Sequence, residues 1–267
     1  MMSELIHTER QGHVAILTLD RPDARNALGR EGDGDAVRRV CDAINRDPQV
    51  RCVVLTGRGD VFSAGGDIKA MKERSGAFAA DAVAIRDGYR RNIHEIVRSI
   101  YGLEVPCIAA VNGPAIGLGC DVACMADIRL SSDRARYGAT FLNLGLVPGD
   151  GGAWLLPRVI GMSRACELLF TAKLIDAETA ASWGLVSRVV AHDELMAEAL
   201  LMAAAVAGQP PHALRLTKSL LRQGAHASYD TIMEMSAAAQ AISHLTEDHM
   251  EGVTAMLERR PPIFQGR

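Results

Sequence analysis

Short apolar runs rich in β-branched residues alternate along the chain with stretches of helical apolar spacing. The strand-like runs are residues 14–19, 50–56, 107–111 and 128–130, and the helical stretches between them are residues 35–46 and 77–100. Glycine or a turn-forming residue follows most of the strand-like runs, which limits their length. Strands that are separated by helices predict an α/β architecture.

The pattern changes near residue 190. Strand signals vanish there, and segments rich in alanine, leucine and methionine follow, with Pro210-Pro211 as a break. We therefore expect an α/β core at residues 1–200 and a helical C-terminal region at residues 201–267. No repeat of fixed period divides the chain further.

Bulk properties exclude several classes of protein. The net charge of -3 and a pI near 6.2 give no general attraction to nucleic acid or to an anionic membrane. The six cysteines form no CxxC pair, which is typical of core thiols in a reducing compartment. A secretory signal is missing, as is an apolar run long enough to span a membrane. These features predict a cytoplasmic protein.

Two glycine-rich elbows, residues 62–69 and 112–121, each lead from a strand toward a helix. Glycine permits positive φ and lets a ligand approach the backbone closely. Free N–H groups at the start of a following helix could form an oxyanion hole, which stabilises charge on a carbonyl oxygen. Simple tight turns are the alternative. The elbows match neither G-x-G-x-x-G nor a P-loop, and the chain has no G-x-S-x-G or H-E-x-x-H motif.

Taken in order, these segments resemble the crotonase (enoyl-CoA hydratase/isomerase) superfamily over nearly the whole chain. The matching segments are residues 21–22, 26–28, 53–57, 64–69, 110–113, 127–129, 144–149, 177–186 and 259–267. The resemblance implies a spiral of ββα units with a helical C-terminal trimerisation region, assembled as a homotrimer or a dimer of trimers. It also implies an acyl-CoA substrate, with coenzyme A as part of the substrate, no separate cofactor and no metal.

The resemblance also implies roles for individual residues. Gly66 and Leu118 correspond to the two backbone oxyanion donors, so the side chain at position 118 matters little for that role. The elbow residues Ala64 and Gly117 would border the bound thioester. Lys69 corresponds to a position near a CoA phosphate, although a solvated first-turn lysine is the alternative.

Two residues near the C-terminus complete the implied substrate site. Arg260 and Phe264 would reach the CoA of a neighbouring subunit. The basic run at residues 258–260 is otherwise typical of a solvated helix end.

The carboxylates bear on the reaction. Family hydratases that the chain resembles carry two glutamates, but the chain has Asp121 at the first position and Phe141 at the second. Phenylalanine neither accepts nor donates a proton, and a positioned acid or base is worth about 10²–10⁴ in rate. Asp150, in a loop where some isomerases of the family carry a carboxylate, could replace the missing acid. Asp121 with Asp150 could then shuttle a proton between two carbons of an enolate held in the oxyanion hole. These residues therefore favour double-bond isomerisation over fast hydration.

Structural roles remain open for the same residues. Asp150 could cap the following helix, Asp121 could pair with an arginine, and Phe141 could line an acyl pocket. The leading hypothesis is an enzyme that acts on an enoyl-CoA. The alternatives are other acyl-CoA chemistry, such as hydrolysis, decarboxylation or dehalogenation, and a CoA-binding trimer without catalysis.

Overall fold

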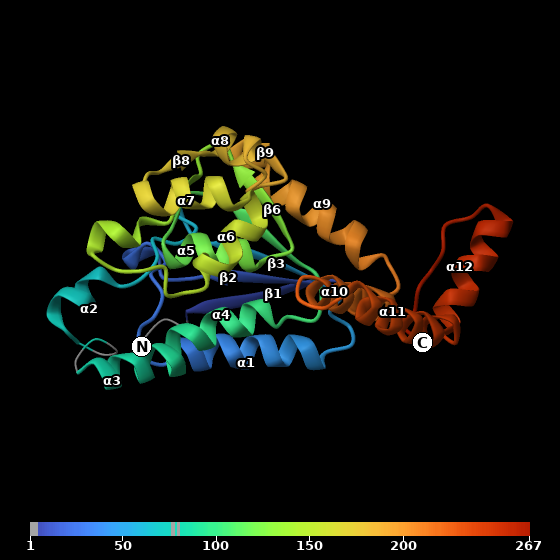
Figure 1. Ribbon diagram of the computed structural model, residues 1–267. Coiled ribbons are helices and arrows are strands. Elements are labelled where there is room, and N and C mark those ends of the chain that lie inside the picture. The colour runs from blue at the N-terminus through green and yellow to red at the C-terminus, as the bar shows by residue number, and fades with distance from the viewer. Residues whose placement is uncertain (1–4, 76–77, 79–80) are drawn as a thin grey trace.

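A computed structural model describes residues 5–75, 78 and 81–267 of the chain. Its centre is a six-stranded sheet in the order β1-β2-β3-β4-β6-β9, in which β1 and β2 are antiparallel and the remaining pairs are parallel (Figure 1). The strands are β1 (Ile6–Gln11), β2 (Val14–Leu19), β3 (Cys52–Gly57), β4 (Cys107–Val111), β6 (Ile128–Ser132) and β9 (Arg188–Val190). This mixed α/β architecture confirms the predicted fold class.

Helices cover both faces of the sheet. Along β2, Leu17 and Leu19 face a large core shared with α1 (Asp33–Arg46), α4 (His94–Tyr101) and α5 (Leu118–Met125). Val14 and Ile16 face the opposite side and pack against α9 (Leu195–Ala207). Successive side chains of a strand point to opposite faces, so strands that are buried on both faces consist almost wholly of apolar residues.

A second, three-stranded sheet has the order β5-β7-β8. Its strands are β5 (Ala115–Ile116), β7 (Arg136–Gly138) and β8 (Ile175–Asp176). The remaining helical elements are η1 (Pro22–Ala24), α2 (Ile68–Glu73), α3 (Ala82–Gly88), the π-helix η3 (Tyr89–Ile93), η4 (Thr140–Leu144), α6 (Gly152–Ile160), α7 (Met162–Thr171), α8 (Ala177–Ser182), η5 (His192–Glu194), α10 (Pro211–Gly224), α11 (Tyr229–His244) and α12 (Glu247–Glu258).

All four predicted strands are present, but the predicted helix at 77–100 is not one uniform helix. A π-helix lies between α3 and α4, while residues 77, 79 and 80 lie outside the described part of the chain. All six cysteines are free and five are buried, which confirms core thiols for all but the half-buried Cys166. No described helix is both long and apolar enough to cross a membrane. The cytoplasmic location stays a prediction.

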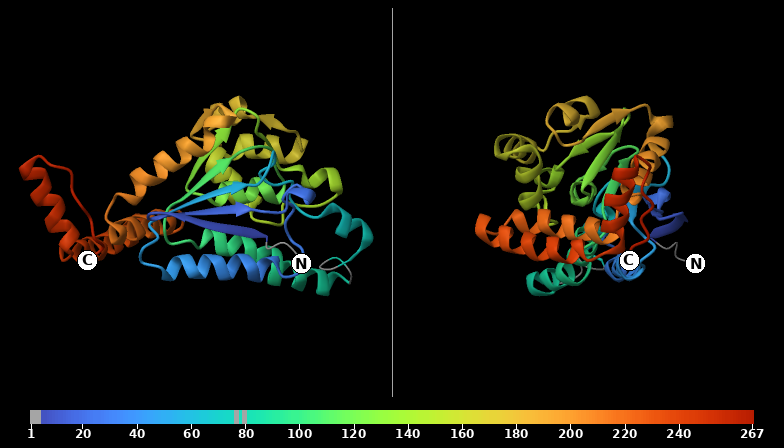
Figure 2. Two further views of the ribbon diagram at one scale, coloured as in Figure 1. Left: turned by 180° about the vertical axis from the view of Figure 1, so that it is seen from behind. Right: turned by 90° about the vertical axis from the view of Figure 1, so that its right-hand side faces the viewer.

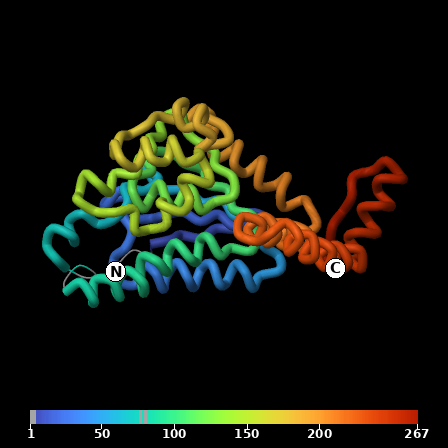
Figure 3. The backbone as a smooth tube through the Cα atoms, in the orientation of Figure 1, coloured from blue at the N-terminus to red at the C-terminus, as the bar shows by residue number. Residues whose placement is uncertain are grey.

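The C-terminal helices extend away from the sheet. Figure 1 and the rear view in Figure 2 place α12 at the end of the molecule opposite α2, and the backbone trace in Figure 3 follows α11 outward to it. Helix α11 has no buried residue. Large apolar side chains are exposed along α11, α12 and the corner between them: Met233, Ile242, Leu245, Met250, Val253, Met256 and Leu257. Position 200, where we expected the core to end, falls within α9, which still packs on the sheet.

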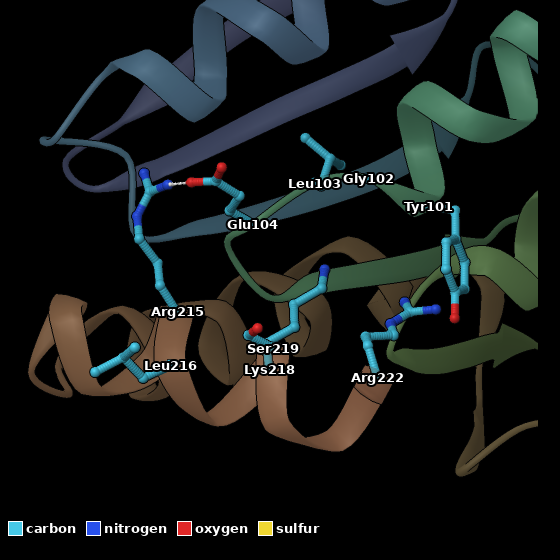
Figure 4. Close-up of a pocket in the computed structure, with 9 residues that line it drawn as sticks. All are labelled: Tyr101, Gly102, Leu103, Glu104, Arg215, Leu216, Lys218, Ser219 and Arg222. Atoms are coloured by element: carbon cyan, nitrogen blue, oxygen red, sulfur yellow. Dashed lines mark hydrogen bonds and ion pairs between the residues drawn. The ribbon is translucent and has the colours of Figure 1, made fainter. Parts of the chain in front are cut away.

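Helix α10 is attached to the core through ion pairs. A cleft of about 410 Å³ lies between residues 101–104 and α10. Figure 4 shows Arg215, Lys218 and Arg222 along one side of the helix. The buried Lys218 ammonium lies 2.8 Å from Asp127, and the Arg222 guanidinium lies 2.7 Å from the same carboxylate. Arg215 pairs with Glu104 at 2.6 Å. Each of these cations has a carboxylate partner, so the ion pairs across the cleft attach α10 to the core.

We expect Asp127→Ala to lower the free energy of unfolding by about 3 kcal/mol, because it leaves the buried Lys218 unpaired. The substitution also removes the acceptor of the Cys107 N–H. Urea denaturation of both proteins measures the change. Glu104→Ala is the matched control in the same cleft, and its more exposed pair should be worth less than about 1 kcal/mol. Equal losses of unfolding free energy in the two variants would contradict the role of Asp127 as the partner of the buried Lys218.

Candidate active site

The two elbows meet at their backbones. Ser63 forms a parallel bridge with Ala115, and the Ile116 N–H donates to the Ser63 carbonyl at 3.0 Å. A Cβ atom on Gly65 would lie 2.5 Å from the Ile116 carbonyl oxygen and 3.4 Å from the Leu118 nitrogen. Gly65 also has a φ of +90°, a conformation that glycine adopts readily. The first elbow therefore packs directly against the start of α5.

Two backbone N–H groups are free at this junction. Leu118 is the first residue of α5, where an N–H has no partner within the helix. Among the described residues, neither the Leu118 N–H nor the Gly66 N–H donates a hydrogen bond. Gly117 precedes Leu118 with a φ of +54° and provides no side-chain cap, so the positive end of the α5 dipole is left open. This arrangement is suited to an oxyanion, and the roles of Gly66 and Leu118 stay predictions.

Asp121 lies one turn into α5 and is fully buried. Its Oδ2 accepts the Gly152 N–H at 2.9 Å, while Oδ1 has no partner in the described part of the chain. Burial raises the pKa of the Asp121 carboxyl well above its ordinary value, and the nearby Cys124 and Asp150 raise it further. A Cβ on Gly152 would lie 2.4 Å from Oδ1, so the contact requires glycine. Asp121 thus caps α6 from a different helix, and no described arginine pairs with it.

Asp150 is 5% exposed and does not cap α6, because the Gly152 N–H donates to Asp121 instead. Its Oδ1 is buried without a hydrogen-bond partner among the described residues. Burial raises the pKa of Asp150 from its ordinary value to about 6. A carboxyl with this pKa can both accept and donate a proton near neutral pH.

The raised pKa of Asp150 has a measurable cost in stability. The folded protein favours the protonated form of Asp150. Its favourable contribution to the free energy of unfolding is therefore fully present below the ordinary pKa, and is lost as pH rises through about 6. We expect Asp150→Asn to raise the free energy of unfolding by up to roughly 3 kcal/mol at about pH 8, and by less than about 1 kcal/mol at about pH 4. Urea denaturation at both pH values measures this. Asp193→Asn, on the surface, should change neither value, and an equal gain at both pH values for Asp150→Asn would refute the assignment.

Asp150 lines a cleft of about 550 Å³ between α4, α5, α6 and the end of α10. Trp154 and His226 form part of its wall with stacked rings, 5.1 Å apart between centroids. Tyr101 meets Trp154 edge-on at 5.7 Å. The remaining lining includes Met125 and is mostly apolar. This cleft can hold an apolar group next to the Asp150 carboxyl.

Phe141 lies beside Gly117 at the start of α5, and its role in lining an acyl pocket stays a prediction. The side chain is 9% exposed, and its ring lies 3.8 Å from the position of a Cβ on Gly117. An apolar ring therefore borders the predicted oxyanion site, at the position where the resemblance implies a glutamate in hydratases. Ala64 lies in the first elbow, and its N–H donates to the Arg25 carbonyl at 2.9 Å.

The residues predicted to bind CoA are not all brought together within one chain. Lys69 is exposed on α2, 3.9 Å from Glu73. Arg260 follows α12, where its guanidinium pairs with Glu251 at 2.6 Å. The Phe264 ring lies 3.6 Å from the Cβ position of Gly252, also in α12. Helices α2 and α12 occupy opposite ends of the molecule (Figure 1).

Similarity to known proteins agrees with this geometry. Residues 9–267 match the family model described as "Enoyl-CoA hydratase/isomerase". The chain belongs to the enoyl-CoA hydratase/isomerase family. The resemblance is thereby confirmed, and the protein is an enzyme of the hydratase/isomerase type.

Relatives and solved structures cover 98% or more of the chain. It is 36% identical to the crotonyl-CoA hydratase of Syntrophomonas wolfei, with 99% of each protein covered. It is 33% identical to the 1,2-epoxyphenylacetyl-CoA isomerase of Escherichia coli, with 100% of each covered. The crystal structure of an enoyl-CoA hydratase from Bacillus anthracis has a TM-score of 0.91 at 31% identity, covering 98% of this chain and 100% of that one. These family members include both reaction types.

Sequence reasoning missed two side chains beside Asp150. The His94 Nε2 lies 2.9 Å from the carbonyl oxygen of Gly149, the residue before Asp150. Tyr89 packs next to it, 6.1 Å from the His94 ring. A lone histidine and a lone tyrosine in a helical stretch carry no motif, so nothing in their spacing indicated this location.

Proposed function

We propose that the protein moves a double bond within an acyl-CoA thioester through an enolate. The N–H groups of Gly66 and Leu118 would bind the thioester oxygen, and Asp150 would carry the proton. The observation that supports this most is the Asp150 carboxyl, which is buried, lacks a hydrogen-bond partner among the described residues, and has a pKa of about 6.

The proton balance of this reaction is simple. Ionised Asp150 takes a proton from the carbon between the thioester carbonyl and the double bond, and the electron pair moves onto the carbonyl oxygen. The enolate then re-forms the carbonyl as the same carboxyl returns the proton to the far carbon. No oxidant, metal or water is consumed, so the reaction needs no cofactor beyond the CoA of the substrate. Asp121, with its raised pKa, would lie beside Asp150 as a neutral neighbour.

Hydration is the second candidate, because several relatives are named hydratases, including the short-chain-enoyl-CoA hydratase of Clostridium acetobutylicum at 37% identity. It requires an activated water as well as a proton donor. Phe141 supplies neither, and its ring lies against the start of α5. This favours isomerisation over fast hydration.

The proposal includes the CoA and the assembly. Lys69 lines a small cavity of about 280 Å³ next to the first elbow, together with Arg30 and the carboxylates of Glu31, Asp67 and Glu73. A CoA phosphate at Lys69 would have to displace its weak pairing with Glu73, 3.9 Å away. Arg260 and Phe264 would reach the CoA of a neighbouring subunit in a homotrimer or a dimer of trimers. The apolar side chains exposed along α11 and α12 support such an interface, because a lone chain leaves them in water.

The test is incubation of the protein with crotonyl-CoA and with a 3-enoyl-CoA in deuterium oxide, followed by mass spectrometry of both products. Double-bond migration or deuteration at the α-carbon, without hydration, is the expected result. Hydrated product at enzymatic rates would overturn the preference for isomerisation. Release of free CoA or carbon dioxide would indicate the other acyl-CoA reactions, and binding without turnover would indicate a non-catalytic protein.

A further inference from the structure

The loop that carries Asp150 accepts one side-chain hydrogen bond. Among the described residues, His94 is the side chain that bonds to residues 147–150, through the Gly149 carbonyl at 2.9 Å. A carbonyl oxygen accepts, so the His94 Nε2 must carry the hydrogen. The imidazole therefore fixes the backbone directly before Asp150.

The π-helix η3 places His94 for this contact. In an α-helix, residues five apart would point about 140° away from each other, because 3.6 residues complete a turn. Here the His94 N–H donates to the Tyr89 carbonyl, the i→i+5 bond of a π-helix, and the two side chains lie together with an interplanar angle of 76°. π-bulges occur frequently at functional sites.

Tyr89 contacts the same backbone from the side. A Cβ on Gly149 would lie 3.6 Å from the Tyr89 ring. Tyr89 is itself braced by Phe78, edge-on at 6.3 Å. The π-helix thus supplies both a hydrogen bond and a packing surface to Gly149.

Asp150 depends on this support, since no described group hydrogen-bonds its buried Oδ1. We propose that His94 is a positioning residue, which holds the Asp150 carboxyl at the bound thioester by donating a hydrogen bond to the Gly149 carbonyl. This rests on the proposed function, in which Asp150 transfers the proton. The other described ionisable groups around Asp150 are Asp121, Tyr89, Arg98, Tyr101 and His226.

The test compares three substitutions of His94. His94→Leu removes the donor, His94→Asn offers a donor that is too short, and His94→Gln offers an amide N–H at similar reach. We expect the Leu and Asn variants to lose about 10- to 100-fold in kcat, with KM within about 2-fold, because small misplacements at a reacting centre cost about this much. The Gln variant should stay within about 3-fold of the wild type. The acid limb of the kcat–pH profile should move in the first two variants only.

Controls separate positioning from folding and from the proposed function. His7→Leu, at an exposed histidine, should leave kcat unchanged, and thermal melting checks that each variant is folded. If His94→Leu does not fold, the Asn and Gln pair still decides the question. On an Asp150→Asn background, His94→Leu should cost less than about 2-fold more, as expected for residues that act as a unit.

Two results would overturn the inference in different ways. If Asp150→Asn abolishes turnover while His94→Leu and His94→Asn remain fully active, His94 does not position the carboxyl and the proposed function stands. If Asp150→Asn is itself fully active, both proposals fall together.

Discussion

Leu118→Pro should lower kcat/KM by about 10²–10³, the usual effect of removing one oxyanion donor. Leu118 is the first residue of α5, where proline is well tolerated and where its missing N–H breaks no hydrogen bond within the helix. The substitution thus removes the proposed donor with little change to the backbone. The measurement is kcat/KM for whichever enoyl-CoA is turned over fastest.

Leu118→Ala is the matched control for this substitution. Leu118 is 1% exposed, so both variants lose a buried side chain and about 2–5 kcal/mol of stability. The alanine variant keeps the N–H, however, and should keep most of its activity at a temperature where both variants are folded. Equal activity in the two variants would exclude the Leu118 N–H from the reaction.

Asp150→Asn should lower kcat by about 10²–10⁴, because the amide has nearly the same shape but cannot accept the proton. The wild type should lose activity as pH falls through about 6, where the base form of Asp150 is lost, and this limb should be missing in the variant. Exchange of the α-hydrogen for deuterium measures the proton step directly, under the same conditions as turnover.

Asp193→Asn is the matched control, since it changes an exposed aspartate of η5 in the same way. It should keep both the rate and the acid limb. Retention of the acid limb in Asp150→Asn would assign that ionisation to another group, with Asp121 as the neighbouring carboxyl.

Apolar patterning predicted four strands of the large sheet, and missed β1 and the short strands β5, β7, β8 and β9. Strand β4 consists wholly of buried residues and was predicted with its observed bounds, 107–111. Strand β1 was missed because five of its six residues are exposed, so its sequence has no apolar signature. The helical pattern of 77–100 could not reveal the π-helix, whose extra residue depends on packing against the loop at Gly149.

The parts of the candidate site that are formed by neighbouring residues in the sequence could be predicted. Contacts between residues far apart in the sequence could not. The elbows could be found because glycine is required locally, at Gly65 and Gly117. Whether Asp150 caps α6 could not be decided, since the group that takes the Gly152 N–H is Asp121, 31 residues away. The partner of His94 lies 55 residues further along, and no spacing indicates such a contact.

The π-helix also affects how this chain compares with its relatives. A π turn contains one residue more than an α turn, so η3 is equivalent to a single inserted residue in an otherwise regular helix. A family member without that residue would show a one-residue gap against positions 89–93, and its preceding helix would be rotated by about 100°. Its residue aligned with His94 would then have no tyrosine beside it. That gap, read from an alignment, would mark family members that must hold the loop before α6 in another way.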